Sequence, residues 1–380
     1  MPLRAPARLA ELPRYEPGLT VAEVMAAHGL DRVVKLASNE SAHPPLEPVQ
    51  RALAGGLHTL NRYPDGAARA LRRALGERHG VGPDRVVVGN GSAELILLAG
   101  QALLEPGTTV VHADPSFAVY PLLAPLAGAH AAAVPLADDD GLDLDAMADA
   151  IDSRTRLLLV CNPNNPTGVS RPAAAVERLL DRAPEDLAVL VDEAYFEFVA
   201  APEAGRVMAL AAERPNLLVT RTFSKAHGLS ALRVGYGVGG PAWIDALDRV
   251  RQPFNTNGLA QAAALESLRH PDALAGRVAE VLAERGRVEA ALRALGVGFT
   301  PSRTNFILLD SGSEGGLPGP ATHRELLIRG VVVRDGASLG CPGRLRVTIG
   351  TPAENAALLG ALEEIRGAVP STPRARIEAR

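Results

Sequence analysis

Apolar runs of strand length alternate with helical patterns through the middle of this 380-residue chain. The runs are almost continuously apolar, which is typical of strands buried on both faces of a largely parallel sheet. Strands that alternate with helices give an α/β architecture. We therefore predict an α/β fold with a largely parallel sheet flanked by helices, whose strands lie at 85–88, 108–112, 156–160, 187–191, 217–220 and 233–237.

The pattern changes beyond Arg251. Long helical stretches at 259–268 and 273–295 precede a smaller α/β unit, and the last residues are rich in Arg, Pro and Ser, a composition typical of disorder. We predict four parts: an N-terminal arm with a polar loop, a large domain, a small α/β C-terminal domain and a disordered tail, over 1–45, 46–260, 261–367 and 368–380.

Composition excludes several classes of protein. The net charge of −4 gives no basic surface for nucleic acid. No apolar run approaches the roughly 20 residues that span a membrane, and the first residues lack the apolar core of a signal peptide. Cys161 and Cys341 are too few for a disulfide framework, which fits a reducing compartment. We expect a cytoplasmic protein whose partners are small molecules, and we predict no metal site.

Lys225 is one of only two lysines among 39 basic residues, the other being Lys35. Arginine stays protonated, so an amine that must lose a proton and attack a carbonyl has to be lysine. Thr222, Ser224 and Arg233 lie close to Lys225 in sequence. Hydroxyls and a guanidinium around such a lysine suggest an aldehyde cofactor that carries a phosphate, and pyridoxal phosphate fits that description. The alternative is a surface lysine in a polar loop.

Other polar stretches follow the predicted strands, where open α/β sheets bind their ligands. Gly89-Asn-Gly-Ser-Ala93 precedes an apolar helix, and the free N–H groups of a helix N-terminus attract phosphate. A tight strand-to-helix turn uses the same residues. Asn162-Pro-Asn-Asn-Pro166 forms a rigid loop whose amides can donate to a fixed oxygen, or it is a plain turn.

Two charged residues within strands need partners. Asp192 closes the strand at 187–191, and a buried acid is costly unless it is paired. A protonated pyridine nitrogen would be such a partner; a magnesium site or a helix cap is the alternative. Arg346 alternates with apolar residues in the strand at 344–350, where a guanidinium that holds a carboxylate or phosphate competes with an exposed edge strand.

In order and spacing, the motifs resemble the fold-type I pyridoxal-phosphate-dependent aminotransferases, and within them the histidinol-phosphate aminotransferase group. The resemblance runs from Tyr15 to about Ile365. It rests on Lys35-Leu-Ala-Ser-Asn-Glu40, Asn61-Arg-Tyr-Pro64, Asn164-Asn-Pro-Thr-Gly168, Asp192-Glu-Ala-Tyr195, Thr222-Phe-Ser-Lys225, Gly228-Leu-Ser-Ala-Leu-Arg-Val-Gly-Tyr236, Arg251-Gln-Pro-Phe-Asn255 and Arg346-Val-Thr-Ile-Gly350.

The resemblance implies a role for each matching residue. Lys225 would form the internal aldimine with pyridoxal 5′-phosphate and then carry the substrate Cα proton. Asp192 would pair with the pyridinium nitrogen, and Tyr195 and Asn165 would bind the ring O3′. The cofactor phosphate would be held by the backbone of Ser92 and Ala93 and the side chains of Thr222, Ser224 and Arg233.

The remaining implied roles concern the ring face, the partner and the substrate. Tyr120 would stack on the ring, and Tyr63 would reach the cofactor of a second subunit, which implies a homodimer with shared active sites. Arg346 would take the acidic group of the substrate. Arg334, Tyr15 and Asn39 would line the substrate end.

The implied reaction moves an amino group between histidinol phosphate, or a related donor, and 2-oxoglutarate. Three alternatives stay open: an aromatic amino acid aminotransferase, a decarboxylase or lyase of the same fold in a specialised pathway, and a non-catalytic nucleotide-binding α/β protein. The last would need a Gly-rich nucleotide loop, which the sequence lacks. The chain departs from the family at Ser41–Pro45 and at His227, for which we expect a buried side chain with a backbone partner.

Overall fold

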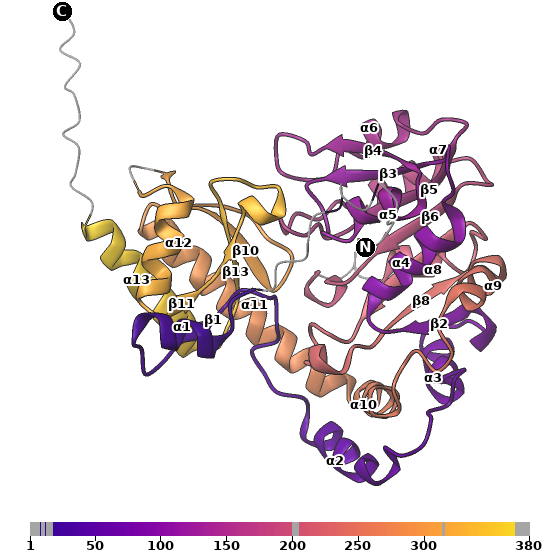
Figure 1. Cartoon of the computed structure of the whole chain (residues 1–380), viewed down its shortest axis with the longest axis horizontal. Helices are drawn as coiled ribbons and strands as arrows, with labels where there is room; N and C mark the ends of the chain where they lie inside the picture. Colours follow the sequence, from indigo (N-terminus) through magenta and orange to yellow (C-terminus); the bar gives the residue numbers. More distant parts are fainter. Residues whose placement is uncertain (1–7, 9–11, 13–17, 200–204, 314–315, 369–380) are drawn as a thin grey trace, which may run out of the picture.

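The computed structural model describes residues 8, 12, 18–199, 205–313 and 316–368, which form two bodies side by side (Figure 1). In the larger body the described residues build a seven-stranded sheet in the order β2-β8-β7-β6-β5-β3-β4. All its strands run in one direction except β8, which is antiparallel to both neighbours. The strands are β2 (Val86–Gly89), β3 (Thr109–Asp114), β4 (His130–Pro135), β5 (Thr155–Cys161), β6 (Ala188–Asp192), β7 (Leu217–Thr222) and β8 (Gly235–Gly239).

The continuous apolar runs of the central strands have a simple cause, because both faces of the sheet are covered. Along β6, Val189 and Val191 pack into the core on one face and Leu190 into the core on the other. Helices α4 (Ser92–Leu103), α5 (Tyr120–Ala127) and α9 (Pro241–Val250) cover the second face. The first face is covered by α2 (Glu47–Gly56), α3 (Arg69–His79), α6 (Leu144–Asp149), α7 (Ala173–Arg182), α8 (Arg206–Leu210) and α10 (Gly258–Leu268).

The predicted α/β class is confirmed, with two differences inside the sheet. Strand β4, His130-Ala-Ala-Ala-Val-Pro135, was not predicted, because it is an edge strand of mostly exposed, alanine-rich sequence without a long apolar run. Strand β8 is reversed, and its connection from β7 contains a single turn of 3₁₀ helix, Ser230–Leu232, and no α-helix. A parallel strand usually follows a crossover that contains an α-helix.

The smaller body has an antiparallel sheet in the order β12-β13-β10-β9, with β9 (Gly298–Thr300), β10 (Phe306–Asp310), β12 (Arg334–Asp335) and β13 (Leu345–Thr348). Helices α11 (Pro271–Ala294), α12 (Gly319–Ile328) and α13 (Pro352–Ala368) pack with it. The N-terminal arm joins this body: α1 (Val21–His28) lies beside it in Figure 1, and β1 (Val34–Lys35) pairs in parallel with β11 (Val331–Val332).

The four-part division of the chain stays a prediction. The predicted tail lies almost wholly outside the described residues, as does Tyr15. Among the helices that the structure describes, none combines the length and the apolar character required to cross a bilayer.

Candidate active site

The predicted site residues gather at the carboxyl end of the large sheet. Asp192 is the last residue of β6, and its register partner Cys161 is the last residue of β5, just before the Asn-Pro loop. Thr222 ends the neighbouring strand β7 and leads directly to Lys225. Parallel neighbours therefore bring these separate segments together at one edge, as the sequence predicts.

Asp192 is 2% exposed, and the Thr220 hydroxyl donates to its Oδ1 at 3.2 Å. Burial raises the pKa of this carboxyl to about 7, well above the ordinary 3.8. No group of three or more His, Cys, Asp or Glu side chains that could hold a metal ion occurs among the described residues. The buried carboxylate of Asp192 lacks a paired charge, and a positively charged group of a bound ligand would supply one.

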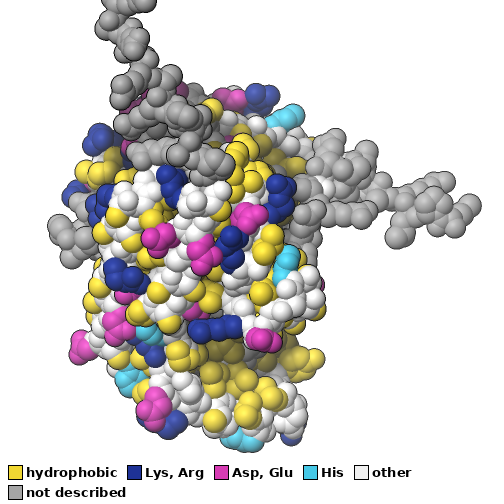
Figure 2. Space-filling view, turned by 90° about the vertical axis from the view of Figure 1, so that its left-hand side faces the viewer, with side chains coloured by type: hydrophobic (Ala, Val, Ile, Leu, Met, Phe, Trp, Pro, Cys, Tyr) yellow, Lys and Arg dark blue, Asp and Glu magenta, His cyan; other side chains and the backbone are white. Residues whose placement is uncertain are grey.

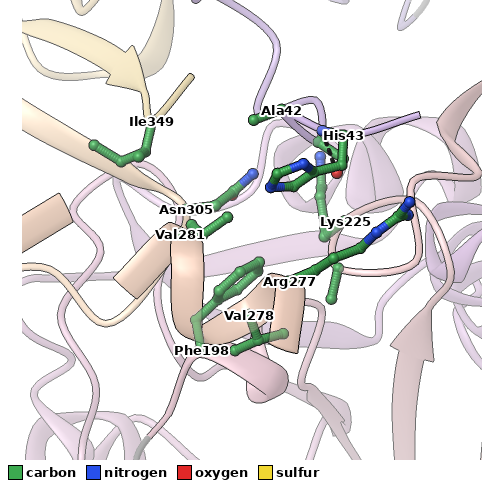
Figure 3. A pocket seen from close by; sticks show the side chains of 11 residues that line it. Ala42, His43, Phe198, Lys225, Arg277, Val278, Val281, Asn305 and Ile349 are labelled. Carbon is green, nitrogen blue, oxygen red and sulfur yellow. Dashed lines mark hydrogen bonds between the residues drawn. The ribbon is translucent and has the colours of Figure 1, made fainter. Parts of the chain in front are cut away.

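Lys225 lies against a small pocket between the two bodies (Figure 3). Its Nζ donates to the backbone carbonyl of Asn39 at 3.0 Å and lies 5.6 Å from the centre of the Tyr195 ring. Burial, with a smaller contribution from Arg346, lowers the Lys225 pKa to about 7. Lys225 is partly buried at this pocket, which disfavours the surface-lysine alternative; Lys35 is also partly exposed, and its amine lies 3.3 Å from Glu40.

Hydroxyls, a guanidinium and a helix N-terminus converge beside Lys225. Helix α4 begins at Ser92, directly after Gly91, whose φ is 78°. A Cβ on Gly91 would lie 2.8 Å from Nη2 of Arg233, so the guanidinium is next to the helix start. Arg233 donates to the Ser224 hydroxyl at 3.3 Å, and the Thr222 hydroxyl donates to Ser224 at 3.0 Å. This is an arrangement that binds phosphate.

Arg346 lies in the middle of the small sheet and is 7% exposed. It donates from Nη1 to Oδ1 of Asn165 at 2.7 Å and from Nη2 to the Ala37 carbonyl at 3.0 Å. Burial lowers its pKa to about 10. Strand β13 lies between β12 and β10, which rules out the exposed edge strand. Arg334 is the register partner of Arg346, and neither forms an ion pair within the described residues.

Asn39 connects the arm to both bodies. Its φ of 53° is left-handed, which is uncommon for a non-glycine residue. Its backbone N–H donates to the Thr348 hydroxyl at 2.9 Å, and its Nδ2 donates to the Tyr195 hydroxyl at 3.0 Å. Burial raises the pKa of Tyr195, so this phenol stays protonated near neutral pH. Tyr195 can therefore donate a hydrogen bond to a ligand oxygen.

The three predicted aromatic residues have different outcomes, and of them only Tyr120 lies beside Asp192 in the described part of the chain. Tyr63 is 81% exposed and stacks on Phe254 with 4.5 Å between ring centres. Tyr15 lies outside the described residues. Tyr120 is completely buried, which fits poorly with stacking on a ligand because no face of its ring is free. Phe117, in edge contact with Tyr120 and only partly buried, is the better placed aromatic.

The expectation for His227 is half right. Its side chain is buried, but its partner is the Ser267 hydroxyl at 2.7 Å and not a backbone group. Burial lowers the pKa of His227 to about 3, so the ring is neutral. The Ser41–Pro45 loop is held from α11, where Arg277 donates to the Pro44 carbonyl at 2.6 Å and His43 lies 3.2 Å from Glu280.

Sequence reasoning missed Asn305 and Thr348 as site residues. Asn305 donates from Nδ2 to the carbonyls of Asn39 and Glu40, both at 3.2 Å. It stands directly before β10, and Thr348 ends β13. The one available signal was a polar residue at the boundary of each otherwise buried strand of the small body.

The residues present fit a phosphorylated pyridine aldehyde. Two buried polar groups at the site, the Tyr120 hydroxyl and Nε of Arg346, have no hydrogen-bond partner among the described residues. The amine, the buried acid and the phosphate-binding arrangement lie at the same edge of the large sheet. Such a group would satisfy buried atoms that the chain leaves unpaired.

Comparison with known proteins gives one consistent answer. The sequence model of the family described as "Aminotransferase class I and II" matches residues 31–362. "Histidinol-phosphate aminotransferase 2" of Pseudomonas fluorescens is 44% identical over 93% of this chain and 95% of its own length. "Histidinol-phosphate aminotransferase 1" of Cupriavidus pinatubonensis is 45% identical over 92% of this chain and 93% of its own.

Solved structures agree. Histidinol-phosphate aminotransferase from Sinorhizobium meliloti, in complex with pyridoxal-5′-phosphate, matches with a TM-score of 0.85 and 26% identity, covering 96% of this chain and 98% of that one. A single mutant of aspartate aminotransferase from Thermus thermophilus matches with a TM-score of 0.82 and 26% identity, covering 96% and 100%.

Proposed function

This chain belongs to the class I and II aminotransferases, and from that premise we propose that it transfers the amino group of histidinol phosphate to 2-oxoglutarate, with pyridoxal 5′-phosphate as its cofactor. The proposed substrate is the one named for relatives at 40–45% identity that align with more than nine-tenths of the chain. An aromatic amino acid aminotransferase and a lyase of the same fold remain outcomes of the test below.

The observation that carries the proposal is the unpaired charge of Arg346. A buried guanidinium without a carboxylate is costly unless a ligand supplies the anion. Arg334 lies opposite it in register, so two guanidiniums face the same end of the site without a counter-ion from the described chain. Histidinol phosphate brings a dianion and 2-oxoglutarate brings carboxylates, and a guanidinium fork accepts either.

Bound pyridoxal phosphate supplies an electron sink for the charge that develops when the substrate Cα loses its proton. Lys225 provides the base, because burial leaves a large fraction of its amine neutral near pH 7. Its Nζ takes the proton from the substrate Cα. Asp192 provides the buried negative charge that keeps a ring nitrogen protonated.

The other residues hold and orient the cofactor. Asn165 and Tyr195 would bind the ring oxygen of the cofactor. Arg346 donates a hydrogen bond to Oδ1 of Asn165 and thereby orients the Asn165 amide. Phe117 is proposed in place of Tyr120 as the aromatic over the ring. The phosphate would be held by the backbone of Ser92 and Ala93, the hydroxyls of Thr222 and Ser224, and Arg233.

The proposal includes a homodimer. Leu57, Leu60, Tyr63 and Phe254 are apolar and 44–81% exposed, an unusual concentration for a surface. Figure 2 shows hydrophobic side chains gathered around a hollow at the lower end of the molecule, the end at which α2 lies in Figure 1. A symmetric pair would cover this apolar surface and bring Tyr63 to the partner's site.

Two further points belong to the same proposal. The seven-stranded and four-stranded sheets support a division into a large and a small domain, and α10 (Gly258–Leu268), which packs on the large sheet, supports a boundary after this helix and not within it at 260/261. Cys161 and Cys341 are both free and buried, which supports a reducing cytoplasmic location.

The test compares kcat/KM for histidinol phosphate, histidinol and phenylalanine, each with 2-oxoglutarate as acceptor. We expect histidinol phosphate to exceed phenylalanine by at least about tenfold, which is about 1.4 kcal/mol of transition-state discrimination. Histidinol, which lacks the phosphate, should also lose at least about tenfold. A preference for phenylalanine, or equal values with and without the phosphate, contradicts the proposed substrate.

A further inference from the structure

One backbone carbonyl receives two donors from opposite bodies of the protein. The carbonyl of Asn39 accepts from Lys225 Nζ at 3.0 Å and from Asn305 Nδ2 at 3.2 Å. Lys225 follows β7 of the large sheet, whereas Asn305 directly precedes β10 of the small sheet. Figure 3 shows both side chains at the same pocket.

The Asn305 amide holds two successive peptide groups. It donates to the carbonyl of Asn39 and also to that of Glu40, at 3.2 Å each, and the side chain is 2% exposed. The left-handed φ of Asn39 is sparsely populated for a residue with a side chain, so it persists only where the surroundings hold it. Asn305 is one of the groups that hold it.

A carbonyl is a suitable partner for an amine that must act as a base. It accepts an N–H from the neutral amine as well as from the ammonium, and it leaves the lone pair of the neutral amine free. A carboxylate in the same place would favour the ammonium and keep the proton on Lys225. The position of this carbonyl therefore decides how the free amine is oriented.

We propose that Asn305 is a positioning residue, which fixes the Asn39 carbonyl as the resting place of the free Lys225 amine. The inference rests on the proposed function for the role of Lys225 as the base, but the hydrogen-bonded contact itself does not depend on the substrate. The charged groups around the amine are the guanidiniums of Arg346 and Arg233, which lower its pKa, and the carboxylates of Glu40 and Asp192, which raise it.

The first experiment measures the amine directly in the cofactor-free full-length protein. Trace acetylation with acetic anhydride over a series of pH values, read by mass spectrometry, gives the reactivity of Lys225 relative to Lys35, the only other lysine. In Asn305→Ala the Asn39 carbonyl loses its support, and the ammonium loses an acceptor that stabilises it. We expect the midpoint for Lys225 to fall by about half a pH unit or more, and that of Lys35, whose amine lies 3.3 Å from Glu40, to move by less.

Asn355→Ala is the matched control, because Asn355 is also a fully buried asparagine of the small body, but it bonds Gly350 and Glu284 instead of the Asn39 loop. It should leave the Lys225 profile unchanged. An unchanged profile in Asn305→Ala, or an equal change in Asn355→Ala, overturns the proposal. If Asn305→Ala does not fold, Asn305→Leu keeps the side-chain size without the N–H donors and should lower the midpoint in the same way, and an unmoved midpoint there overturns the proposal too.

The second experiment uses the cofactor-loaded enzyme. Asn305→Ala should lower kcat by about tenfold or more and change KM for histidinol phosphate by less than about threefold, because the loss falls on proton transfer and not on substrate binding. A change in KM alone would contradict the positioning role. Absence of turnover in the unaltered protein would count against the proposed function, and the acetylation result would still decide the inference.

Discussion

Arg346 donates a hydrogen bond of 2.7 Å from Nη1 to Oδ1 of Asn165. The first residue lies in β13 of the small sheet and the second in the loop after β5 of the large sheet. The same guanidinium also holds the Ala37 carbonyl of the arm at 3.0 Å. The charge proposed to bind the substrate is therefore oriented before any ligand arrives, and it orients the proposed cofactor-binding amide in turn.

Arg346→Lys should lower kcat/KM for both substrates by about a hundredfold or more, because an ammonium cannot form the planar two-pronged contact. Steady-state kinetics with histidinol phosphate and with glutamate measure it. The control is Arg344→Lys, two residues earlier, where the side chain pairs with Asp140 at 2.8 Å. Activity within about twofold is expected there, and an equal loss in both variants would assign Arg346 a structural role only.

Asp192→Asn should abolish transamination and largely spare cofactor uptake. The neutral amide cannot balance a protonated ring nitrogen, whereas the phosphate-binding groups around Ser224 and Arg233 are untouched. Turnover and cofactor retention after gel filtration, measured on the same sample, separate the two effects. Turnover equal to that of the unaltered protein would reduce Asp192 to a structural cap.

The same substitution should stabilise the cofactor-free protein at high pH. The Asp192 pKa is raised to about 7 in the folded state, so the unaltered protein loses stability as the pH rises from about 4 through 7, whereas the amide does not titrate. Above pH 7 the Asn variant should be more stable by roughly 2 to 4 kcal/mol, and below pH 4 the two should be equal. Urea unfolding at several pH values measures the free energy of unfolding of both proteins. A difference between them that does not change with pH would contradict the raised pKa of buried Asp192.

Leu60→Asp should break the proposed homodimer and remove activity, because it places a charge in the exposed apolar surface next to Tyr63. Sedimentation velocity and turnover measure both effects. Ile328→Asp, on α12, is the control, since Ile328 is comparably exposed but lies on the small body. A fully active monomer of the unaltered protein would contradict the shared active site.

Local patterns in the sequence predicted the framework of the fold and singled out the candidate residues at the centre of the proposed site. Continuous apolar runs reveal strands such as β5 and β6, because burial on both faces selects such residues. Strand β4 was not predicted, because an exposed edge strand needs no apolar run. Lys225 and Asp192 were singled out because only lysine offers an amine that can act as a nucleophile, and because an acid at the end of a buried strand needs a partner.

Contacts between distant segments were not predictable in the same way. Asn305 meets Asn39 across 266 positions of the sequence, and Arg346 meets Asn165 across 181. An asparagine before a strand is ordinary, and only the packing of the small body against the arm gives it a role. The burial of Tyr120 behind Phe117 likewise depends on how α5 packs against the sheet.

The central claim is that Lys225 carries the cofactor, and borohydride reduction tests it most directly. The cofactor-loaded protein is reduced, digested and mapped by mass spectrometry, with Lys35, the only other lysine, as the internal control. The account predicts a pyridoxyl label on Lys225 and an unlabelled Lys35. A label on Lys35, or no label on either lysine, would contradict it.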